Sequence, residues 1–224
     1  MEQDRINLIT IEGNIGVGKS TLMAFLKSFA WAEADISVVF IDEPVEEWLE
    51  YGLLQNLYDQ NISAEAFQYA ALSSVVAHTC KAIMAAPSGT KLFIAERSVA
   101  SNMQVFAKAS IREVPQLRTF EYAYAHIVAS LPQNISYQHL LLQTYPEICM
   151  ARIKQRARTS ESAITLEYLR ELHDLHSAWM QQSEAGPAAP KWHVVDAARD
   201  SQSVVVEALG ILMGIVAALE VDAM

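Results

Sequence analysis

The stretch IEGNIGVGKST, residues 11 to 21, has the residue types and spacing of a loop that holds nucleotide phosphates. An apolar run precedes it and a helical pattern follows it, which is the context that the pattern G-x-x-x-x-G-K-[ST] requires. Backbone N–H groups in such a loop point at phosphate oxygens, and the helix N-terminus adds partial positive charge. We expect the nucleotide to contact Gly13, Asn14, Gly16, Gly18, Lys19, Ser20 and Thr21.

Two of these side chains have specific expected roles. Lys19 should reach the β- and γ-phosphates of ATP, and the hydroxyl of Ser20 should ligate Mg²⁺. The alternative is a chance glycine turn between a strand and a helix, but all the constrained positions of the pattern are filled. The loop therefore predicts an enzyme or switch that uses ATP and Mg²⁺.

A carboxylate suited to proton transfer follows the next apolar run, in DEPVEEW, residues 42 to 48. Pro44 stops the strand, which leaves Glu43 at its carboxyl end, where ligands of parallel sheets bind. A carboxylate there can accept the proton of an attacking hydroxyl. We interpret Glu43 as a catalytic base, whereas Glu46 and Glu47 fit a solvated acidic helix start.

A third group of polar residues ends the run KLFIA, as Glu96, Arg97 and Ser98. Glu96 could help to hold Mg²⁺ or its waters, and Arg97 could orient Glu43 and the acceptor oxygen. The alternative is an ion pair that is only structural.

A basic segment, RIKQRARTSES, spans residues 152 to 162. Arg152, Arg156 and Arg158 recur near one helical face and lead into a polar break. Guanidinium groups on a moving segment suit the negative charge of a transferring phosphoryl group, so we expect a lid at about 152–164. A basic helix end that stabilises the helix dipole is the alternative.

The elements that must position these residues alternate between strand and helix patterns. This alternation predicts an α/β fold with a parallel sheet covered by helices on both faces, and ligands at the carboxyl ends of its strands. The expected strands are 6–11, 36–41, 91–95, 139–143 and 191–195. The expected helices are 19–30, 46–58, 63–86, 98–109, 114–131, 145–157, 165–182 and 202–219.

Composition narrows the class of partner. The 224 residues, 52% of them hydrophobic, can bury one core, so we expect a single domain over 1–224. The net charge of −10 disfavours a surface that holds nucleic acid. The N-terminus lacks a basic and apolar secretory signal, and Cys80 and Cys149 show no paired spacing, so we expect a cytoplasmic protein.

The C-terminal segment 203–220 is apolar enough to raise the question of a membrane anchor. Its uninterrupted apolar part, residues 208 to 219, is shorter than the ~20 residues that span a bilayer. We therefore expect a packed C-terminal helix and no membrane partner.

The chain resembles the deoxynucleoside kinase family, which includes the insect multisubstrate enzyme, mitochondrial thymidine kinase, and deoxycytidine and deoxyguanosine kinases. The motifs that carry the likeness are EGNIGVGKST, DEPVEEW, the FQ of AFQYAAL, ERSVASNMQVF and RIKQRARTSESAITLEYLRELHDLHSAW. The resemblance implies a P-loop NTPase-type three-layer fold, with a five-stranded parallel sheet and an arginine-rich lid. It also implies transfer of the ATP γ-phosphoryl group to the 5′-hydroxyl of a deoxyribonucleoside.

The resemblance also implies roles for individual residues. Glu43 would be the catalytic base, with Arg97 beside it at the 5′-hydroxyl. The nucleoside would contact Trp48, Tyr58, Phe67, Gln68, Ala71, Val75, Asn102, Phe106 and Glu161. Among these residues the aromatic rings form walls, Gln68 reads the base edge, and Tyr58 and Glu161 hold the sugar 3′-hydroxyl. The loop VVDAARD would flank the adenine of ATP.

The base preference depends on a few pocket positions. An amide at Gln68 that rotates freely can match either thymine or cytosine. The family's cytosine- and purine-preferring members place an Arg and an Asp where this chain has Val75 and Asn102, and Ala71 is also small. We expect thymidine and deoxycytidine to be good acceptors and purine deoxynucleosides to be poorer.

Two other functions fit a phosphate loop. A nucleoside monophosphate kinase would need several arginines on the acceptor side, where this chain has DEPVEE. A nucleotide switch that hydrolyses slowly would need elements that respond to the γ-phosphate. We also expect a homodimer, since the helices 98–109 and 114–131 carry broad apolar faces and relatives pair through such helices.

Overall fold

The computed structural model describes residues 5–31, 36–158, 161–183 and 189–222. Its centre is a five-stranded sheet in the order β2-β3-β1-β4-β5, and every neighbouring pair of strands is parallel. The strands are β1 (Ile6–Gly13), β2 (Val38–Ile41), β3 (Leu92–Glu96), β4 (Ile135–Gln143) and β5 (Lys191–Asp196). The predicted parallel α/β sheet is therefore confirmed.

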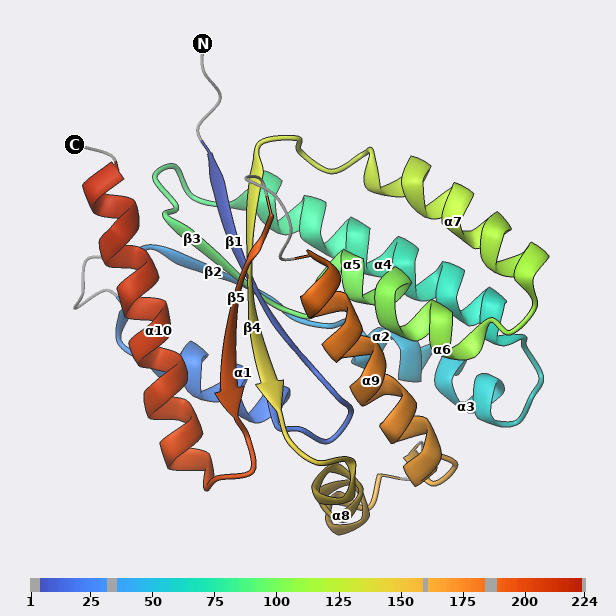
Figure 1. The fold of residues 1–224 in the computed structure, drawn as a ribbon. Coiled ribbons are helices and arrows are strands. Elements are labelled where there is room, and N and C mark those ends of the chain that lie inside the picture. Colours follow the sequence, from blue (N-terminus) through green and yellow to red (C-terminus); the bar gives the residue numbers. More distant parts are fainter. Residues whose placement is uncertain (1–4, 32–35, 159–160, 184–188, 223–224) are drawn as a thin grey trace.

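Helices cover both faces of the sheet, so the fold has three layers (Figure 1). On one face lie α1 (Lys19–Ser28) and α10 (Ser201–Asp222), and on the other lie α4 (Ala64–Ala85), α7 (Val114–Val128) and α9 (Leu166–Ser183). The short helices α2 (Val45–Glu50) and α3 (Leu53–Tyr58) follow β2, and α8 (Pro146–Arg156) follows β4. Since β1 is the central strand, its phosphate loop lies in the middle of the carboxyl edge.

The alternation of side chains along β1 explains the two covered faces. Ile9 and Ile11 are buried in the cluster that contains Leu22 of α1 and Leu212 of α10. Leu8 points to the opposite face, into a separate cluster with Phe93. A strand that is apolar on both faces has to lie between two layers of helices, which is the arrangement observed.

The predicted helix 98–109 is correct in position but not in regularity or exposure. It consists of α5 (Val99–Ser101), the π-helix η2 (Asn102–Ala107) and α6 (Lys108–Ser110). Met103, Val105 and Ala107 are buried, so most of the apolar face of this segment belongs to the core. The expectation that 98–109 offers an apolar face to a partner is therefore wrong.

The predicted helix 46–58 is also interrupted. It divides into α2 and α3 at Gly52, which has a positive φ of 67°. This left-handed residue lets the chain change direction between two short helices, and it brings Trp48 and Tyr58 to the same cavity.

Helix α10 is long and apolar enough to cross a membrane by length and composition, with a mean hydropathy of 2.0 over Ser201–Leu219. Its inner side packs on the core, where Ala208 and Leu212 are fully buried. About a third of that window, 33%, is buried in the protein, so an outer face remains exposed. A core helix of a soluble protein passes the same length and composition test, and the buried side is what we expected of this segment.

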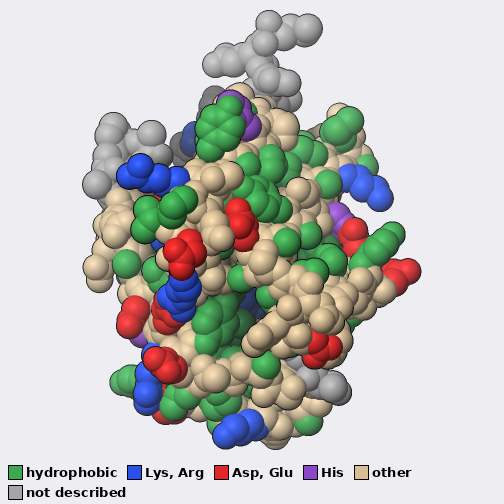
Figure 2. All heavy atoms as spheres, turned by 90° about the vertical axis from the view of Figure 1, so that its right-hand side faces the viewer, with side chains coloured by type: hydrophobic (Ala, Val, Ile, Leu, Met, Phe, Trp, Pro, Cys, Tyr) green, Lys and Arg blue, Asp and Glu red, His purple; other side chains and the backbone are tan. Residues whose placement is uncertain are grey.

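Seen from the side of α7, the surface mixes hydrophobic, acidic and basic side chains (Figure 2). Large exposed hydrophobic residues occur on two adjacent helices, with Met84 of α4 85% exposed and Tyr122 of α7 70% exposed. Unlike the π-helical segment, α4 and α7 do offer apolar surface.

Candidate active site

The phosphate loop is packed against the protein on one side and open on the other. Gly16 and Gly18 have φ values of 77° and 117°, which residues with a side chain rarely adopt. A Cβ atom at Gly16 would lie 2.7 Å from the carbonyl oxygen of Cys149, whereas one at Gly18 would meet nothing within 4 Å. The loop is therefore packed against α8 at Gly16 and is open at Gly18, where α1 begins.

The side chain of Asn14 anchors this loop. Its Nδ2 donates to the carbonyl oxygen of Leu169 in α9 at 2.7 Å, and its Oδ1 accepts the N–H of Ile15 at 2.8 Å. Asn14 belongs to the phosphate loop as expected, but its amide is engaged in holding the loop in place.

The amino group of Lys19 lies inside the loop. Its Nζ donates to the carbonyl oxygens of Asn14 at 3.0 Å and Gly13 at 3.2 Å, and the side chain is buried. Burial, with a smaller contribution from the Arg97 guanidinium, lowers the pKa of Lys19 to about 8. A phosphate bound in the loop would raise the pKa of Lys19 again, because an adjacent anion favours the charged form of the amine.

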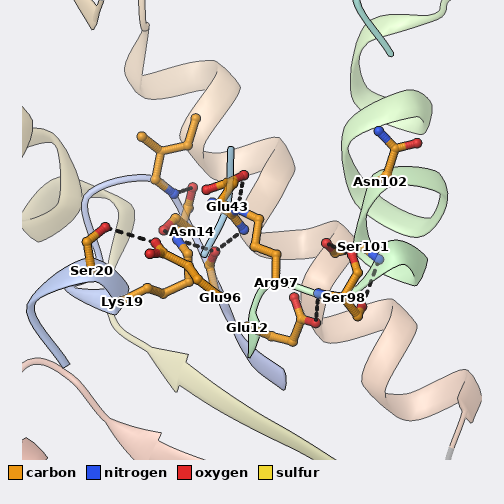
Figure 3. A network of polar contacts seen from close by, with 12 residues as sticks. Glu12, Asn14, Lys19, Ser20, Glu43, Glu96, Arg97, Ser98, Ser101 and Asn102 are labelled. Carbon is orange, nitrogen blue, oxygen red and sulfur yellow. Dashed lines mark hydrogen bonds and ion pairs between the residues drawn. The ribbon is translucent and has the colours of Figure 1, made fainter. Parts of the chain in front are cut away.

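The predicted metal ligands come together. The hydroxyl of Ser20 donates to Oε1 of Glu96 at 2.9 Å across the mouth of the loop (Figure 3). Among the described residues there is no cluster of three His, Cys, Asp or Glu side chains that could hold a metal by itself. One hydroxyl and one carboxylate nevertheless fit Mg²⁺, which usually takes its other ligands from nucleotide phosphates and water.

The catalytic pair predicted from two strand ends is also assembled. Glu43 Oε1 lies 3.0 Å from Nε of Arg97, with the side chains 17% and 7% exposed (Figure 3). The contact lacks hydrogen-bond geometry, which makes it an ion pair at short range. Burial raises the pKa of Glu43 above its usual value, and the guanidinium of Arg97 partly opposes this shift. A carboxylate of raised pKa is a better proton acceptor near neutral pH.

By contrast, Glu46 and Glu47 are exposed in the first turn of α2. Glu47 lies 3.0 Å from the ring of His78, on the outside of the molecule. Both glutamates are therefore the solvated helix-start carboxylates that we expected.

A cavity of about 360 Å³ extends from the phosphate loop toward α4. It is lined by Glu43 and by every residue predicted to bind the nucleoside: Trp48, Tyr58, Phe67, Gln68, Ala71, Val75, Arg97, Asn102, Phe106 and Glu161. Its volume suits a nucleoside-sized ligand. Residues that are far apart in the sequence thus line one site, with Glu43 and Arg97 at the end nearest the loop.

The amide of Gln68 is held by its neighbours. Asn102 Nδ2 donates to Gln68 Oε1 at 2.9 Å, and Gln68 Nε2 donates to Ser110 Oγ at 3.3 Å. Ser110 in turn donates to the carbonyl oxygen of Phe106, which can only accept. The expectation of a freely rotating amide is therefore wrong, because the direction of this chain fixes which end of Gln68 is the donor.

The lid arginines fall into two groups. Arg152 lies within α8 and donates to the carbonyl oxygens of Val17 and Ala197, both at 2.8 Å. It is therefore not part of a mobile lid, because its guanidinium ties the phosphate loop to the loop after β5. Arg156 and Arg158 contact Glu161 at 2.6 and 3.7 Å, which places a basic turn over the cavity. Residues 159–160 of the predicted lid lie outside the described residues.

A second cavity of about 260 Å³ adjoins the other side of the phosphate loop. Gly18, Thr21 and Arg152 line it, together with Ala197 and Arg199 of the VVDAARD segment. This is where the resemblance placed the adenine of ATP. The two cavities meet at Gly16, Gly18, Thr21 and Arg156, which line both.

Sequence reasoning missed Tyr168 and Ser110, which also line the nucleoside cavity. Tyr168 lies in α9 and Ser110 ends α6, and neither belongs to a pattern with recognisable chemistry. Burial raises the pKa of Tyr168, so its phenol stays protonated and can donate a hydrogen bond. Nothing in the sequence indicated which face of either helix meets the cavity.

Comparison with known proteins agrees with this geometry. The deoxynucleoside kinase family model matches residues 9–208. Mitochondrial thymidine kinase 2 of Macaca fascicularis is 28% identical, over 88% of this chain and 72% of its own. A probable deoxycytidine kinase of fowlpox virus is 32% identical over 78% of this chain and 72% of its own, and deoxycytidine kinase 2 of Gallus gallus is 32% identical over 80% and 76%. The chain belongs to the deoxynucleoside kinase family and is an ATP-dependent kinase of deoxynucleosides.

Proposed function

We propose that this kinase phosphorylates the 5′-hydroxyl of thymidine and deoxycytidine in preference to purine deoxynucleosides. The observation that carries the proposal is the nucleoside cavity, which has Glu43 and Arg97 at its phosphate-loop end and is also lined by Gln68, Ala71 and Val75. Small neutral side chains beside the amide leave room for a pyrimidine and its 5-methyl group. Relatives named as thymidine kinase and as deoxycytidine kinase have similar sequences.

In the proposed mechanism Glu43 accepts the proton of the 5′-hydroxyl as the oxygen attacks the γ-phosphorus, while the bond from that phosphorus to the bridging oxygen breaks and ADP leaves. Arg97 keeps the carboxylate and the acceptor oxygen together, and Lys19 stabilises charge on the transferring group. Arg156 and Arg158 supply further positive charge from the lid. Ser20 and Glu96 would hold Mg²⁺, which would neutralise part of the phosphate charge.

The alternative of a monophosphate acceptor is disfavoured by the acceptor side of the cavity. The carboxylate of Glu43 lies there, and Arg156 already contacts Glu161. Separation of the products formed from labelled ATP tests the reaction directly. We expect a deoxynucleoside monophosphate; a nucleoside diphosphate made from a monophosphate acceptor, or free phosphate alone, would overturn the proposal.

The proposed base preference predicts a ranking of acceptors. Both pyrimidines can be served because Ala71, Val75 and Asn102 bring no charge to the cavity beside Gln68 that would select one base. We expect kcat/KM for thymidine and deoxycytidine to exceed that for deoxyadenosine and deoxyguanosine by about 10- to 200-fold, the usual scale of pocket discrimination. Steady-state kinetics with the four deoxynucleosides measures this ranking, and a purine in first place would contradict it.

The proposed assembly is a homodimer formed through α4 and α7. These adjacent helices expose Met84 (85%) in α4, and Tyr122 (70%) and Val114 (65%) in α7. Exposed apolar surface on neighbouring helices is typical of an interface. Light scattering at micromolar concentration should therefore give about twice the chain mass of 24.8 kDa.

Tyr122→Glu should shift the scattering mass toward the monomer, because it introduces a charge into the proposed interface. The control is Tyr145→Glu, since Tyr145 is equally exposed at 71% but lies before α8. A wild-type mass of one chain would contradict the dimer.

A further inference from the structure

The arginine beside the proposed catalytic base has an unusual backbone conformation. Arg97 has a φ of 66°, in the left-handed region, which is costly for a residue with a side chain. Such a conformation persists only where the surrounding structure imposes it, and it is enriched at functional sites. The conformation lets the chain leave β3 and enter α5 while the guanidinium of Arg97 reaches Glu43.

Consecutive residues of the neighbouring strand β1 hold this turn. The carbonyl oxygen of Ile11 accepts the N–H of Arg97 at 3.1 Å, and the carbonyl oxygen of Gly13 accepts its Nη1 at 2.8 Å. Between them, Oε1 of Glu12 accepts the N–H of Ser98 at 2.8 Å (Figure 3). The backbone on each side of the strained residue is therefore fixed from β1, once by a carbonyl and once by a side chain.

Glu12 is well placed to be a rigid support. Glu12 is fully buried, and its Oε1 also accepts a hydrogen bond from the hydroxyl of Thr10 at 2.8 Å. Thr10 lies 2.6 Å from Nδ1 of His139, whose pKa burial lowers, so the ring is neutral near pH 7. A buried carboxyl group whose Oε1 accepts two hydrogen bonds has little freedom, and supporting bonds of this kind keep catalytic groups in position.

Apart from the hydrogen bond from Nη1 to Gly13, the contacts of the Arg97 guanidinium are not directional. Its Cζ lies 4.5 Å above the ring of Phe106, and its contact with Glu43 lacks hydrogen-bond geometry. Stacking and a short-range ion pair fix distance better than direction. The direction of the guanidinium therefore depends on the single bond to Gly13 and on the backbone at residues 97 and 98.

We propose that Glu12 is a positioning residue for catalysis: by holding the N–H of Ser98, it fixes the left-handed turn that directs Arg97 at Glu43. The inference rests on the proposed roles of Glu43 and Arg97 in phosphoryl transfer. Glu12 does not line the nucleoside cavity and acts through Arg97. Its effect is therefore on turnover and not on nucleotide binding.

Two substitutions separate the reach of Glu12 from its charge. Glu12→Gln keeps an acceptor oxygen at the same reach without a charge, whereas Glu12→Asp keeps a carboxylate but withdraws it by roughly 1.5 Å, one carbon–carbon bond. We expect the Asp variant to lose about 10- to 100-fold in kcat, since misplacement by about 1 Å can cost that much, with KM for ATP within about twofold. The Gln variant should retain kcat within about threefold of the wild type.

Additional variants show whether the effect passes through Arg97. Combined with Arg97→Lys, Glu12→Asp should cost less than about threefold more, because residues that act through one another are not additive. Thr10→Val removes the other hydrogen bond to Glu12 but leaves the bond to Ser98, so it should lower kcat by less than Glu12→Asp does. An Asp variant with normal kcat, a Gln variant as poor as the Asp variant, or additive losses with Arg97→Lys would overturn the proposal.

Amide hydrogen exchange provides a measurement that does not depend on activity. The N–H of Ser98 should exchange slowly in the wild type and in Glu12→Gln, and faster in Glu12→Asp. Equal exchange in all three proteins would overturn the positioning role. If the three proteins showed this exchange pattern but the wild type did not phosphorylate nucleosides, the proposed function would be overturned and the positioning role of Glu12 would not.

Discussion

Glu43→Gln is expected to lower kcat by about 10²- to 10⁴-fold, the usual cost of losing a general base. The amide has nearly the shape of the carboxylate and can still lie beside Arg97, 3.0 Å from its Nε in the wild type, but it cannot take the proton of the 5′-hydroxyl. Binding of ATP and nucleoside should change little. Single-turnover kinetics and calorimetric titration measure these two quantities separately.

The pH dependence of kcat provides a second test of Glu43 as the base. Burial raises the pKa of Glu43, and only the deprotonated carboxylate accepts a proton, so kcat should fall as the pH drops through a value above the usual 4.5. This acidic limb should be absent in Glu43→Gln. Glu46→Gln is the matched control, because Glu46 is exposed one turn away and should leave both kcat and the profile unchanged. Near wild-type turnover in Glu43→Gln would exclude Glu43 as the base.

Lys19→Met is expected to reduce kcat/KM by about 10²- to 10³-fold, the scale found when one preorganised charge-stabilising donor is removed. The ammonium group of Lys19 lies inside the phosphate loop, 3.0 Å from the carbonyl oxygen of Asn14, where the transferring phosphate is expected. Methionine keeps the packing of this buried position but has no donor. Lys27→Met on the same helix is the control, since Lys27 pairs with the exposed Asp42 outside the site.

The same substitution should change how stability depends on pH in the nucleotide-free protein. The pKa of Lys19 is lowered to about 8 from 10.5, so between these values the unfolded chain binds more protons than the folded one. This group therefore makes the free energy of unfolding rise with pH across that window, and it destabilises the fold below it. Urea unfolding at pH 7.5 and 10 should show a smaller rise for Lys19→Met than for the wild type; an equal rise would contradict the lowered pKa.

The sequence alone determined the sheet and the edge at which chemistry occurs. Apolar runs that alternate with helical patterns specify parallel strands between helices, because runs without polar faces must be covered on both sides. Local rules also placed the phosphate loop, since Gly13, Gly16 and Gly18 fill positions whose positive φ values the structure shows. Glu43 and Glu96 follow their strands directly, so the order of elements sufficed to bring them to one edge.

Only the tertiary structure decided how the side chains at that edge are held. Arg152 has the spacing of a lid arginine, but two backbone carbonyls from distant segments surround its guanidinium. Gln68 loses its freedom of rotation to Asn102, 34 positions away, and Glu12 supports Ser98 from 86 positions away. Sequence patterns record periodicity within one element, whereas hydrogen bonds between elements depend on how those elements pack. The residues of this site could therefore be found from the chain, but their orientation depends on contacts that form only when the sheet and helices assemble.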